Sequence, residues 1–558
     1  MKVFRRLLEE HQADPGDRRW LFVPYDQLSD AIGPLSREDP GTLGVVLIEN
    51  LWQLSRRPYH RQKLAYLLGN QRHFALEQAA RGVAVRYIVG ESPYHPVLRP
   101  LISELGPLRA MTPAERELRV DVQPLAESGG LELIAHEGWL TSHEQFLSAR
   151  KKGPPWRMDV FYKYIRRETG VLMRRGKPAG GKFSFDPLNR EPWRGSPKLP
   201  EPPTFRLDPI KEEVGALVEA DFAQHPGELH LEALPATKGD VEKLWSWAKR
   251  DCLPQFGTYE DAMSCYSSGL FHTRLSAIIN LHRLLPARVV AEVEKLRIPL
   301  PSKEGYIRQV LGWREFVRHV HLAGDGFRRL PAGSQKAADV PGDAGYERWA
   351  GRPWPKLEAV ERLDGGALPC ALGCDSPLPP AYWGIKSGLY CLDQVVSEVW
   401  KEGWSHHITR LVVLSGIATM LDVSPRELTD WFSVAYVDSY DWVVEPNVLG
   451  MGTFAVGDYM STKPYVTGAA YINRMSDYCA RCVFSPRSNC PLRNLYWAFL
   501  GRHKEVLRDN PRMKMAIAAM RKRSGAQRRQ DQEVFRRVRR LLAAGEAVTP
   551  RALPPVSA

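Results

Sequence analysis

Long apolar runs and abundant cysteine are both missing from this sequence of 558 residues. No apolar stretch approaches the ~20 residues that a membrane-spanning helix needs. The charged opening segment, MKVFRRLLEEHQADPGDRRW, lacks the apolar core of a signal peptide. Eight cysteines in so long a chain are too few for a disulfide scaffold. We therefore expect a cytoplasmic protein with reduced thiols and no membrane partner.

Acidic residues are also in deficit. The 77 lysines and arginines outnumber the 64 aspartates and glutamates, which gives a formal charge of +13 and a pI near 9.3. The excess is concentrated between Arg512 and Arg540, where 11 basic residues stand against Asp531 and Glu533. Such a run suits contacts with a phosphate backbone. It equally suits a solubilising tail, helical or disordered, so the charge alone leaves a nucleic-acid partner open.

The first part of the chain has the pattern of an α/β domain. A helical segment, 61–82, lies among segments that predict strands, which are 20–26, 43–49, 83–89, 118–124 and 131–136. This order favours a largely parallel sheet. No GxGxxG motif follows the first strand, which excludes the ordinary dinucleotide fingerprint. Ligands of such sheets bind beyond the carboxyl ends of the strands, which here points to Tyr25, Asp26, Gln27 and Glu49.

Proline and glycine mark the domain boundaries. They are dense between Gly176 and Pro209, which predicts a long surface connection. Apolar residues recur at helical spacing from Val241 to about Arg508. A second irregular stretch is too long for a connector, which predicts an insertion, a lid or partial disorder. The expected parts are an α/β domain (1–137), a linker with helices (138–240), an all-helical domain (241–510) with an irregular insertion (324–380), and a basic tail (511–558).

The helical part concentrates polar side chains that could bind a ligand. Hydroxyls and an arginine near one helix start suit a pyrophosphate, although each also suits helix capping; they are Ser267, Ser268, His272, Thr273, Arg274 and Ser276. The adjacent His406 and His407 point about 100° apart on a helix, which is typical of structural residues or of half a metal site. Carboxylates beside aromatic residues occur at cofactor sites and at helix ends alike, and here they are Asp438 and Asp441.

Three of the eight cysteines are close together in YCARCVFSPRSNCP, at Cys479, Cys482 and Cys490. A CxxC followed by Cys-Pro is typical of metal-bound thiolates, and four cysteines suit zinc and an iron–sulfur cluster equally. Three ligands need a fourth. The candidates are the CALGC pair, Cys370 and Cys374, and Cys391 in GLYCLDQ.

These motifs, taken in order, resemble the iron–sulfur bacterial cryptochromes and photolyases, a group that includes the prokaryotic (6-4) photolyases. The resemblance covers about residues 20–512. It is carried by DQLS (26–29), QRHF (71–74), YEDAM (259–263), FHTRLS (271–276), IRQVLGWREFVR (307–318), HHITRL (406–411), WVVEPNVLGM (442–451), TKPY (462–465), MSDYCARC (475–482) and CPLRNLYWAFLGR (490–502).

The resemblance implies a Rossmann-like α/β antenna domain followed by an all-α domain that holds FAD and a [4Fe–4S] cluster. It implies Cys391 as the fourth cluster ligand, with Cys479, Cys482 and Cys490, and leaves Cys252, Cys265, Cys370 and Cys374 as free thiols. Asp438 is expected to face the flavin N5 edge. The implied FAD contacts are Tyr259, His272, Thr273, Arg274, Leu275, Ser276, Gln309, Trp313, Arg314, His407, Arg410, Asp438, Asp441 and Trp442.

Three further sets of residues take roles from the same resemblance. His406 and His407 match the paired histidines beside the lesion pocket, and Trp383 and Trp431 match the electron-relay aromatics. The antenna pocket, which in this group holds 6,7-dimethyl-8-ribityllumazine, is expected at Asp26, Glu49, Tyr59 and Lys63. Tyr25 replaces the usual glycine before Asp26 and is expected to narrow or close that pocket.

The function that the resemblance implies is light-driven repair of pyrimidine (6-4) photoproducts, with damaged DNA, single- or double-stranded, as the partner of a monomer. The alternative is a blue-light photoreceptor, a cryptochrome that uses the same flavin without repair. Ser267–Ser268–Gly269 stands where the family has a tryptophan before its counterpart of LFHTRLS, and this favours the alternative. A flavoprotein that binds nucleic acid without photochemistry is a third possibility.

Overall fold

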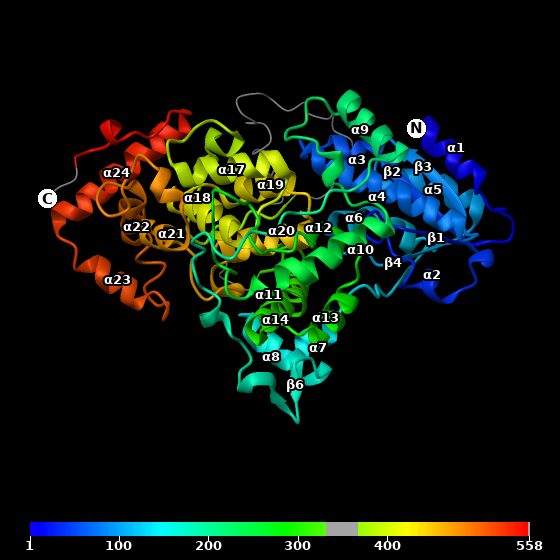
Figure 1. Cartoon of the computed structure of the whole chain (residues 1–558), viewed down its shortest axis with the longest axis horizontal. Coiled ribbons are helices and arrows are strands. Elements are labelled where there is room, and N and C mark those ends of the chain that lie inside the picture. The colour runs from blue at the N-terminus through cyan, green and yellow to red at the C-terminus, as the bar shows by residue number, and fades with distance from the viewer. Residues whose placement is uncertain (331–365, 556–558) are drawn as a thin grey trace.

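The computed structural model describes residues 1–330 and 366–555. The molecule is elongated, with the parallel sheet at one end, a helical body in the middle and the helices α22 (Pro491–Arg502), α23 (Lys514–Arg521) and α24 (Gly525–Ala543) at the other end (Figure 1). The two termini therefore lie at opposite ends of the long axis.

A five-stranded sheet forms the core of the N-terminal domain. Its strands are β1 (Arg19–Phe22), β2 (Leu43–Asn50), β3 (Ala84–Gly90), β4 (Leu108–Met111) and β5 (Leu131–Ile134). All neighbouring strands are parallel and their order is β3-β2-β1-β4-β5. The order reverses between β1 and β4, which is where ligands of doubly wound sheets bind. The predicted Rossmann-like α/β domain is confirmed.

Helices cover both faces of this sheet. One face packs on α1 (Lys2–Glu10), α4 (Arg61–Ala80) and α9 (Pro209–Asp221), through residues such as Phe4, Phe74 and Ile210. The other face packs on α5 (Tyr94–Leu105) and α6 (Arg116–Glu127), through Leu98 and Val122. Strand β2 is buried along its whole length because it lies between two strands and between two layers of helices.

One predicted strand is wrong. Segment 118–124 lies in helix α6. The strand next to β1 is β4, which has only four residues and was not predicted. Alternation of Leu118, Val120 and Val122 suggested a strand, but Val120 is exposed, whereas Leu118, Val122 and Leu125 are buried. This spacing of four and three residues is that of one helix face.

The other described parts of the chain are largely helical, as predicted. Apart from the two-residue strands β6 (Met173–Arg174) and β7 (Lys177–Pro178), the described residues after β5 form no named strand. The remaining α-helices are α2 (Pro34–Arg37), α3 (Leu51–Ser55), α7 (His143–Ala149), α8 (Met158–Thr169), α10 (Lys238–Trp247), α11 (Leu253–Phe256), α12 (Ser276–Asn280), α13 (Pro286–Lys295), α14 (Leu300–Ile307), α15 (Glu315–Ala323), α17 (Tyr390–Glu402), α18 (Gly416–Met420), α19 (Pro425–Ala435), α20 (Asp441–Glu445) and α21 (Ala469–Met475).

Turns of π-helix interrupt the helices at three of the motif segments. They are η6 (Arg308–Arg314), η9 (Thr409–Ser415) and η10 (Pro446–Gly452). Such π-bulges widen a helix locally and occur frequently at functional sites. They coincide here with IRQVLGWREFVR, HHITRL and WVVEPNVLGM, so these motifs share an uncommon backbone geometry.

The basic C-terminal run is folded. Helix α24 packs on α22 through an apolar face that includes Phe535 and Val538, and it leaves Arg528, Arg529 and Arg540 exposed. The core of the predicted insertion, 331–365, lies outside the described residues. Among the helices that the structure describes, none combines the length and apolar character needed to cross a membrane.

Candidate functional site

Three histidines meet in the interior of the helical body. The His272 ring stacks on His406 with centroids 4.6 Å apart, and His407 meets His272 edge-on at 5.3 Å. The Nε2 atom of His272 donates to the Glu260 carbonyl oxygen at 3.1 Å. Burial lowers the pKa of His272 to about 3 and that of His407 to about 4. All three rings are therefore neutral near pH 7, since burial also lowers the pKa of His406 well below its usual value.

Two guanidinium groups lie beside these histidines, each held by a carboxylate. Arg274 donates to Glu402 at 2.6 Å and to the Ser268 hydroxyl at 2.6 Å. Arg410 donates through two nitrogens to Asp438, at 3.0 and 2.9 Å. These pairs fix the direction of both arginines. The histidines and the arginine of HHITRL therefore lie in one region, at the start of the π-helical turn η9.

Most of the other predicted flavin contacts surround the same region, and each has a protein partner. The Thr273 hydroxyl lies 3.0 Å from the Tyr306 hydroxyl, and Gln309 donates to Glu260. The rest of the set is Tyr259, packed on Phe271; Leu275, in the apolar core; Ser276, which accepts from Trp404 Nε1; and Trp313, edge-on to Phe316. Their roles toward a flavin stay predictions.

Arg314, Asp441 and Trp442 lie elsewhere, at the contact between the two halves. The Arg314 guanidinium lies 4.1 Å from the Trp139 ring centroid and 5.1 Å from that of Trp442. The Asp441 carboxylate accepts from the backbone N–H of Arg116 at 2.6 Å, at the start of α6. The structure therefore does not bring these three residues next to the histidines.

Tryptophans connect the helical interior to the surface. The buried Trp431 meets Trp400 edge-on at 5.9 Å, and Trp400 stacks on the partly exposed Trp383 at 5.5 Å. On the inner side, Tyr436 lies 6.0 Å from Trp431 and beneath the Arg410 guanidinium, 3.9 Å from it. Trp400 was not predicted, because nothing in the sequence of α17 distinguishes it from an ordinary core residue. Only its contacts with Trp431 and Trp383 do so.

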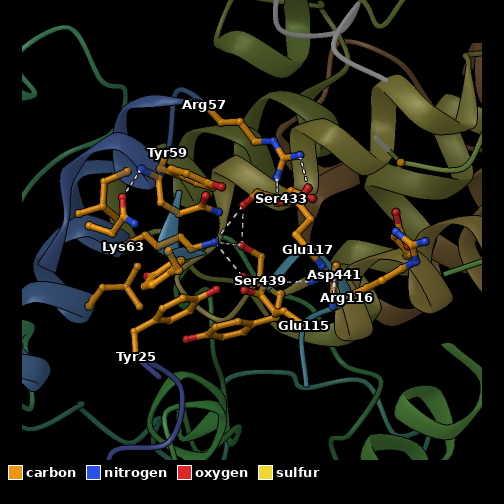
Figure 2. A pocket seen from close by; sticks show the side chains of 18 of the residues that line it. Tyr25, Arg57, Tyr59, Lys63, Glu115, Arg116, Glu117, Ser433, Ser439 and Asp441 are labelled. Carbon is orange, nitrogen blue, oxygen red and sulfur yellow. Dashed lines mark hydrogen bonds and ion pairs between the residues drawn. The ribbon is translucent and has the colours of Figure 1, made fainter. Parts of the chain in front are cut away.

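A cavity of about 960 Å³, counted out to the open solvent, lies between the α/β domain and helices α19 and α20 (Figure 2). Tyr59 and Lys63, predicted for the antenna, line it together with Tyr25. The Lys63 ammonium donates to the Ser439 hydroxyl at 2.8 Å and to the Ser433 carbonyl at 3.2 Å. Burial lowers the pKa of Lys63 to about 7.

The other two predicted antenna residues do not line this cavity. Because side chains alternate along β2, Asn50 reaches the cavity whereas Glu49 points to the opposite face. There Glu49 accepts from two nitrogens of Arg72, at 2.9 and 2.7 Å, and from the Tyr87 hydroxyl. Asp26 is buried nearby, and burial raises its pKa to about 7. Its Oδ1 has no partner among the described residues.

The four predicted metal-binding cysteines converge. Cys391 near the start of α17 and Cys479, Cys482 and Cys490 before α22 line one small cavity, closed by apolar residues such as Phe484. A tetrahedral zinc site would hold its sulfurs roughly 3.8 Å apart. Among the described residues, no three of these sulfurs form a group within 4.8 Å of one another. Their convergence makes the four thiols a candidate metal-binding group.

Comparison with known proteins identifies the class. Residues 21–233 match the family model described as deoxyribodipyrimidine photo-lyase-related protein. The structure is similar to a bacterial class III photolyase from Agrobacterium tumefaciens (TM-score 0.50, 14% identity, 95% of this chain and 98% of that one). It is also similar to the Synechocystis sp. PCC6803 cryptochrome (TM-score 0.53, 14% identity, 92% and 94%). These likenesses define the photolyase and cryptochrome fold.

The sequence places the chain within that class. It is 31% identical over 516 residues to the (6-4) photolyase of Agrobacterium fabrum, covering 89% of this chain and 94% of that protein. The chain therefore belongs to the photolyase-related family, as the motifs indicated.

Membership in this family implies FAD as a cofactor, and the residues of the helical body fit one. His406 Nδ1 is buried and has no hydrogen-bond partner among the described residues, as expected of an atom that serves a bound group. Arg274 and Arg410, each oriented by a carboxylate, present guanidinium donors nearby, and such donors suit the pyrophosphate of a dinucleotide.

Proposed function

We propose that this protein is a DNA photolyase that repairs pyrimidine (6-4) photoproducts in damaged DNA under blue light. The observation that carries the proposal is the 31% identity to a (6-4) photolyase over nearly the whole chain. The buried histidine group supports it, because a pair of histidines on a flavin-facing surface can guide protons during lesion cleavage. FAD, when bound in its reduced state, supplies the light-driven electron.

The proposed FAD site is the region around His272, Arg274, Arg410 and Asp438. Arg410 is oriented by both oxygens of Asp438, so Asp438 can fix the charge near the flavin ring while Arg410 balances it. Arg274, oriented by Glu402 and Ser268, is the group we propose for the phosphates. Asp441, which caps α6 across the domain contact, is a weaker member of this set.

We propose that His406 and His407 lie beside the lesion pocket and that one of them contacts the photoproduct. His407 is partly exposed whereas His406 is buried against His272, so His407 is the one that a flipped-out base can reach. Because the pKa of His407 is lowered to about 4, the ring is neutral in the free protein near pH 7. It can then donate one hydrogen bond and accept another, and it gains a proton only when a negative charge develops beside it.

A repair assay tests this proposal. Purified holoprotein with reduced FAD is illuminated with an oligonucleotide that carries one (6-4) photoproduct, and intact thymines are measured by chromatography. We expect repair by the unchanged protein and a loss of at least about 100-fold in His407→Ala. Flavin absorbance in the variant shows whether the cofactor is still bound. Absence of repair with reduced FAD present would contradict the proposal, and repair of a cyclobutane dimer alone would correct the lesion class.

A photoreceptor is the second candidate function, and one contact favours it. Gly269 stands directly before LFHTRLS, and a side chain there would come within 3.2 Å of Arg274 Nε. A side chain here would require Arg274 to move by a few tenths of an ångström, and Ser267–Ser268–Gly269 stands in place of the family's lesion-pocket tryptophan. Light-dependent protection from proteolysis, in a protein that does not repair DNA, would favour signalling.

We also propose that Cys391, Cys479, Cys482 and Cys490 bind a [4Fe–4S] cluster. Their convergence on one cavity, with one Cys-x-x-Cys pair and a Cys-Pro, supports it. The expected iron content is about four per chain, and Cys482→Ser should lower it strongly. Zinc in place of iron at full occupancy of this group would contradict the assignment.

The interdomain cavity is the proposed site of a 6,7-dimethyl-8-ribityllumazine antenna, held by Tyr59 and Lys63. The lining by both predicted residues and the buried ammonium support it. Bound lumazine should appear as a fluorescent compound released on denaturation, and Lys63→Met should lower its content.

We expect a monomer in solution, which sedimentation will test. The domain boundaries 1–137, 138–240, 241–510 and 511–558 are proposed as units for limited proteolysis.

A further inference from the structure

Two cysteines that the proposed cluster does not use lie beside a histidine and a carboxylate. Cys374 Sγ, an Asp422 oxygen and a His503 ring nitrogen lie within 4.8 Å of one another. They come from three segments: the loop before Pro380, the turn after α18, and the end of α22. Cys374 and His503 are buried, and Asp422 is mostly covered. Contact between such distant segments is not a consequence of local sequence.

The distances among these atoms are close to those of a tetrahedral zinc site. Cys374 Sγ lies 3.9 Å from Asp422 Oδ1, and His503 Nε2 lies 3.0 Å from the same oxygen. With ordinary zinc–ligand bonds, a tetrahedron would separate sulfur from oxygen by roughly 3.5 Å and nitrogen from oxygen by roughly 3.3 Å. Both separations differ from the observed ones by about 0.4 Å or less, which small side-chain rotations supply.

Cys370 provides the fourth ligand and the second sulfur. Its Sγ lies outside the group of three atoms within 4.8 Å of one another, so its side chain must rotate to reach the ion. Its Sγ accepts a hydrogen bond from the Cys374 backbone N–H at 2.9 Å and lies 3.2 Å from the Cys374 carbonyl oxygen. The turn CALGC therefore places the Cys370 sulfur against the backbone of Cys374. An N–H donor aimed at sulfur stabilises a thiolate, and a spacing of three residues between cysteines is within the range of zinc-binding pairs.

Neighbouring residues orient the group and balance its charge. Arg502 donates to both oxygens of Asp422, at 2.8 and 2.9 Å, and ligating carboxylates are commonly held in this way. The His503 ring packs against Phe499 at 4.7 Å, which limits its rotation. Two thiolates and one carboxylate carry three negative charges, and Zn²⁺ together with the Arg502 cation cancels them.

We propose that Cys370, Cys374, Asp422 and His503 form a structural zinc site, separate from the four-cysteine group. Thiolate, imidazole and carboxylate ligands at this spacing are the ones that Zn²⁺ takes in tetrahedral sites. The site has four protein ligands and no open position for substrate, so its role is structural. It would join the loop that carries CALGC to the α18 turn and to α22.

Backbone contacts already hold this loop in place. Ser376 N donates to the Asp422 carbonyl at 2.9 Å, and Ser424 N donates to the Ser376 carbonyl at 2.7 Å. The backbone that carries Cys374 is therefore already in place beside Asp422, and three of the four proposed ligand atoms already lie close together. Preorganised ligands lose little conformational entropy on binding, which favours tight binding.

The test is the metal content of the purified holoprotein, prepared without chelators from zinc-supplemented cells. We expect about one zinc ion per chain in addition to the iron. Cys374→Ser and His503→Gln should each lower zinc by at least about fivefold and leave iron and flavin at the level of the unchanged protein. Cys265→Ser, which alters a thiol outside both groups, is the matched control. Cys482→Ser should have the opposite effect, losing iron and keeping zinc.

X-ray absorption at the zinc edge tests the proposal without any variant. The expected first shell has two sulfurs at about 2.3 Å and two nitrogen or oxygen atoms at about 2.0–2.1 Å. A shell of four sulfurs would assign the zinc to the other cysteine group and overturn the proposal. So would a zinc-free protein that takes up no added zinc, or a disulfide between Cys370 and Cys374 found by mass spectrometry.

Discussion

His60 shows how one buried side chain can connect separate parts of the molecule. Its Nδ1 accepts from the Gln62 backbone N–H at the start of α4, and its Nε2 donates to the Trp400 carbonyl, both at 3.0 Å. The ring also stacks on Trp400, with centroids 5.8 Å apart. Only a neutral imidazole can accept at one nitrogen and donate at the other. Burial accordingly lowers the pKa of His60 to about 4.

This pKa predicts how His60 affects stability. Between pH 4 and 6.5 the unfolded chain binds a proton at His60 that the folded protein does not bind, so folding stability rises with pH in this window. The contribution is complete above pH 6.5 and amounts to about 3 kcal/mol. His60→Asn keeps a side-chain cap for α4 but removes the titration. Its thermal midpoint should fall less steeply than that of the unchanged protein on acidification from pH 6.5 to 4.5. The exposed His11→Asn is the control, and equal slopes for His60→Asn and the unchanged protein would contradict this account.

Trp400 carries a second prediction for a single residue. It lies between Trp431 and Trp383, so we propose that it relays electrons between the flavin region and the surface. Trp400→Phe preserves most of the ring packing but is harder to oxidise. We expect photoreduction of oxidised FAD by an external reductant to slow by about tenfold or more, measured by flavin absorbance. Repair by protein reduced chemically beforehand should be unchanged; loss of repair in that assay would indicate a structural role instead.

Helix α24 shows that an element can be basic and still belong to the fold. Its apolar face covers α22 and includes Phe535, with the Arg502 guanidinium 3.5 Å above its ring. The charged face points outward, with Arg528, Arg529 and Arg540 exposed. From the sequence alone, the basic run could contact DNA or act as a solubilising tail. A folded helix with one basic face is compatible with a DNA contact.

Replacing these three arginines by glutamine tests the contact. Each phosphate contact that is lost should reduce the slope of log affinity against log salt by about 0.9. We expect weaker binding to damaged and undamaged duplexes alike and a thermal midpoint within the error of the unchanged protein. Arg5→Gln with Arg6→Gln, on the exposed face of α1 at the other end of the molecule, is the control. Equal salt slopes for the two variants would favour a solubilising role for α24.

Elements were predictable where their local pattern is unambiguous. Strand β2 is a continuous apolar run, and α4 has the length and composition of a helix, so both were found. Helix α6 was mistaken for a strand because 118–124 alternates over a short stretch, and β4 is only four residues long. The cysteines and histidines that the structure brings together had been singled out by their motifs. The hydrogen bond between Lys63 and Ser439, which are 376 positions apart, could not be predicted from the sequence of either segment.

At the scale of the whole molecule, the two halves are joined by buried polar contacts rather than by a flexible connection. Lys63 of α4 donates to Ser433 and Ser439 of the helical body, and Asp441 accepts from the first N–H groups of α6 (Figure 2). Buried groups of this kind must remain paired, because separation of the halves would leave them without partners. The halves should therefore unfold together.

Lys63→Met tests this joint unfolding. Methionine has a similar length but no donor, so the oxygens of Ser433 and Ser439 lose the ammonium that now lies 2.7–3.2 Å from them. The expected loss is about 1–3 kcal/mol. Because the contact joins the halves, flavin release and the loss of helical circular dichroism should shift to lower temperature together. Lys163→Met, which removes an exposed ion pair with Asp159, should change stability by about 0.5 kcal/mol or less. Flavin release at an unchanged temperature in Lys63→Met would mean that the α/β domain unfolds independently of the helical body, and the contact would then join the domains without coupling their stability.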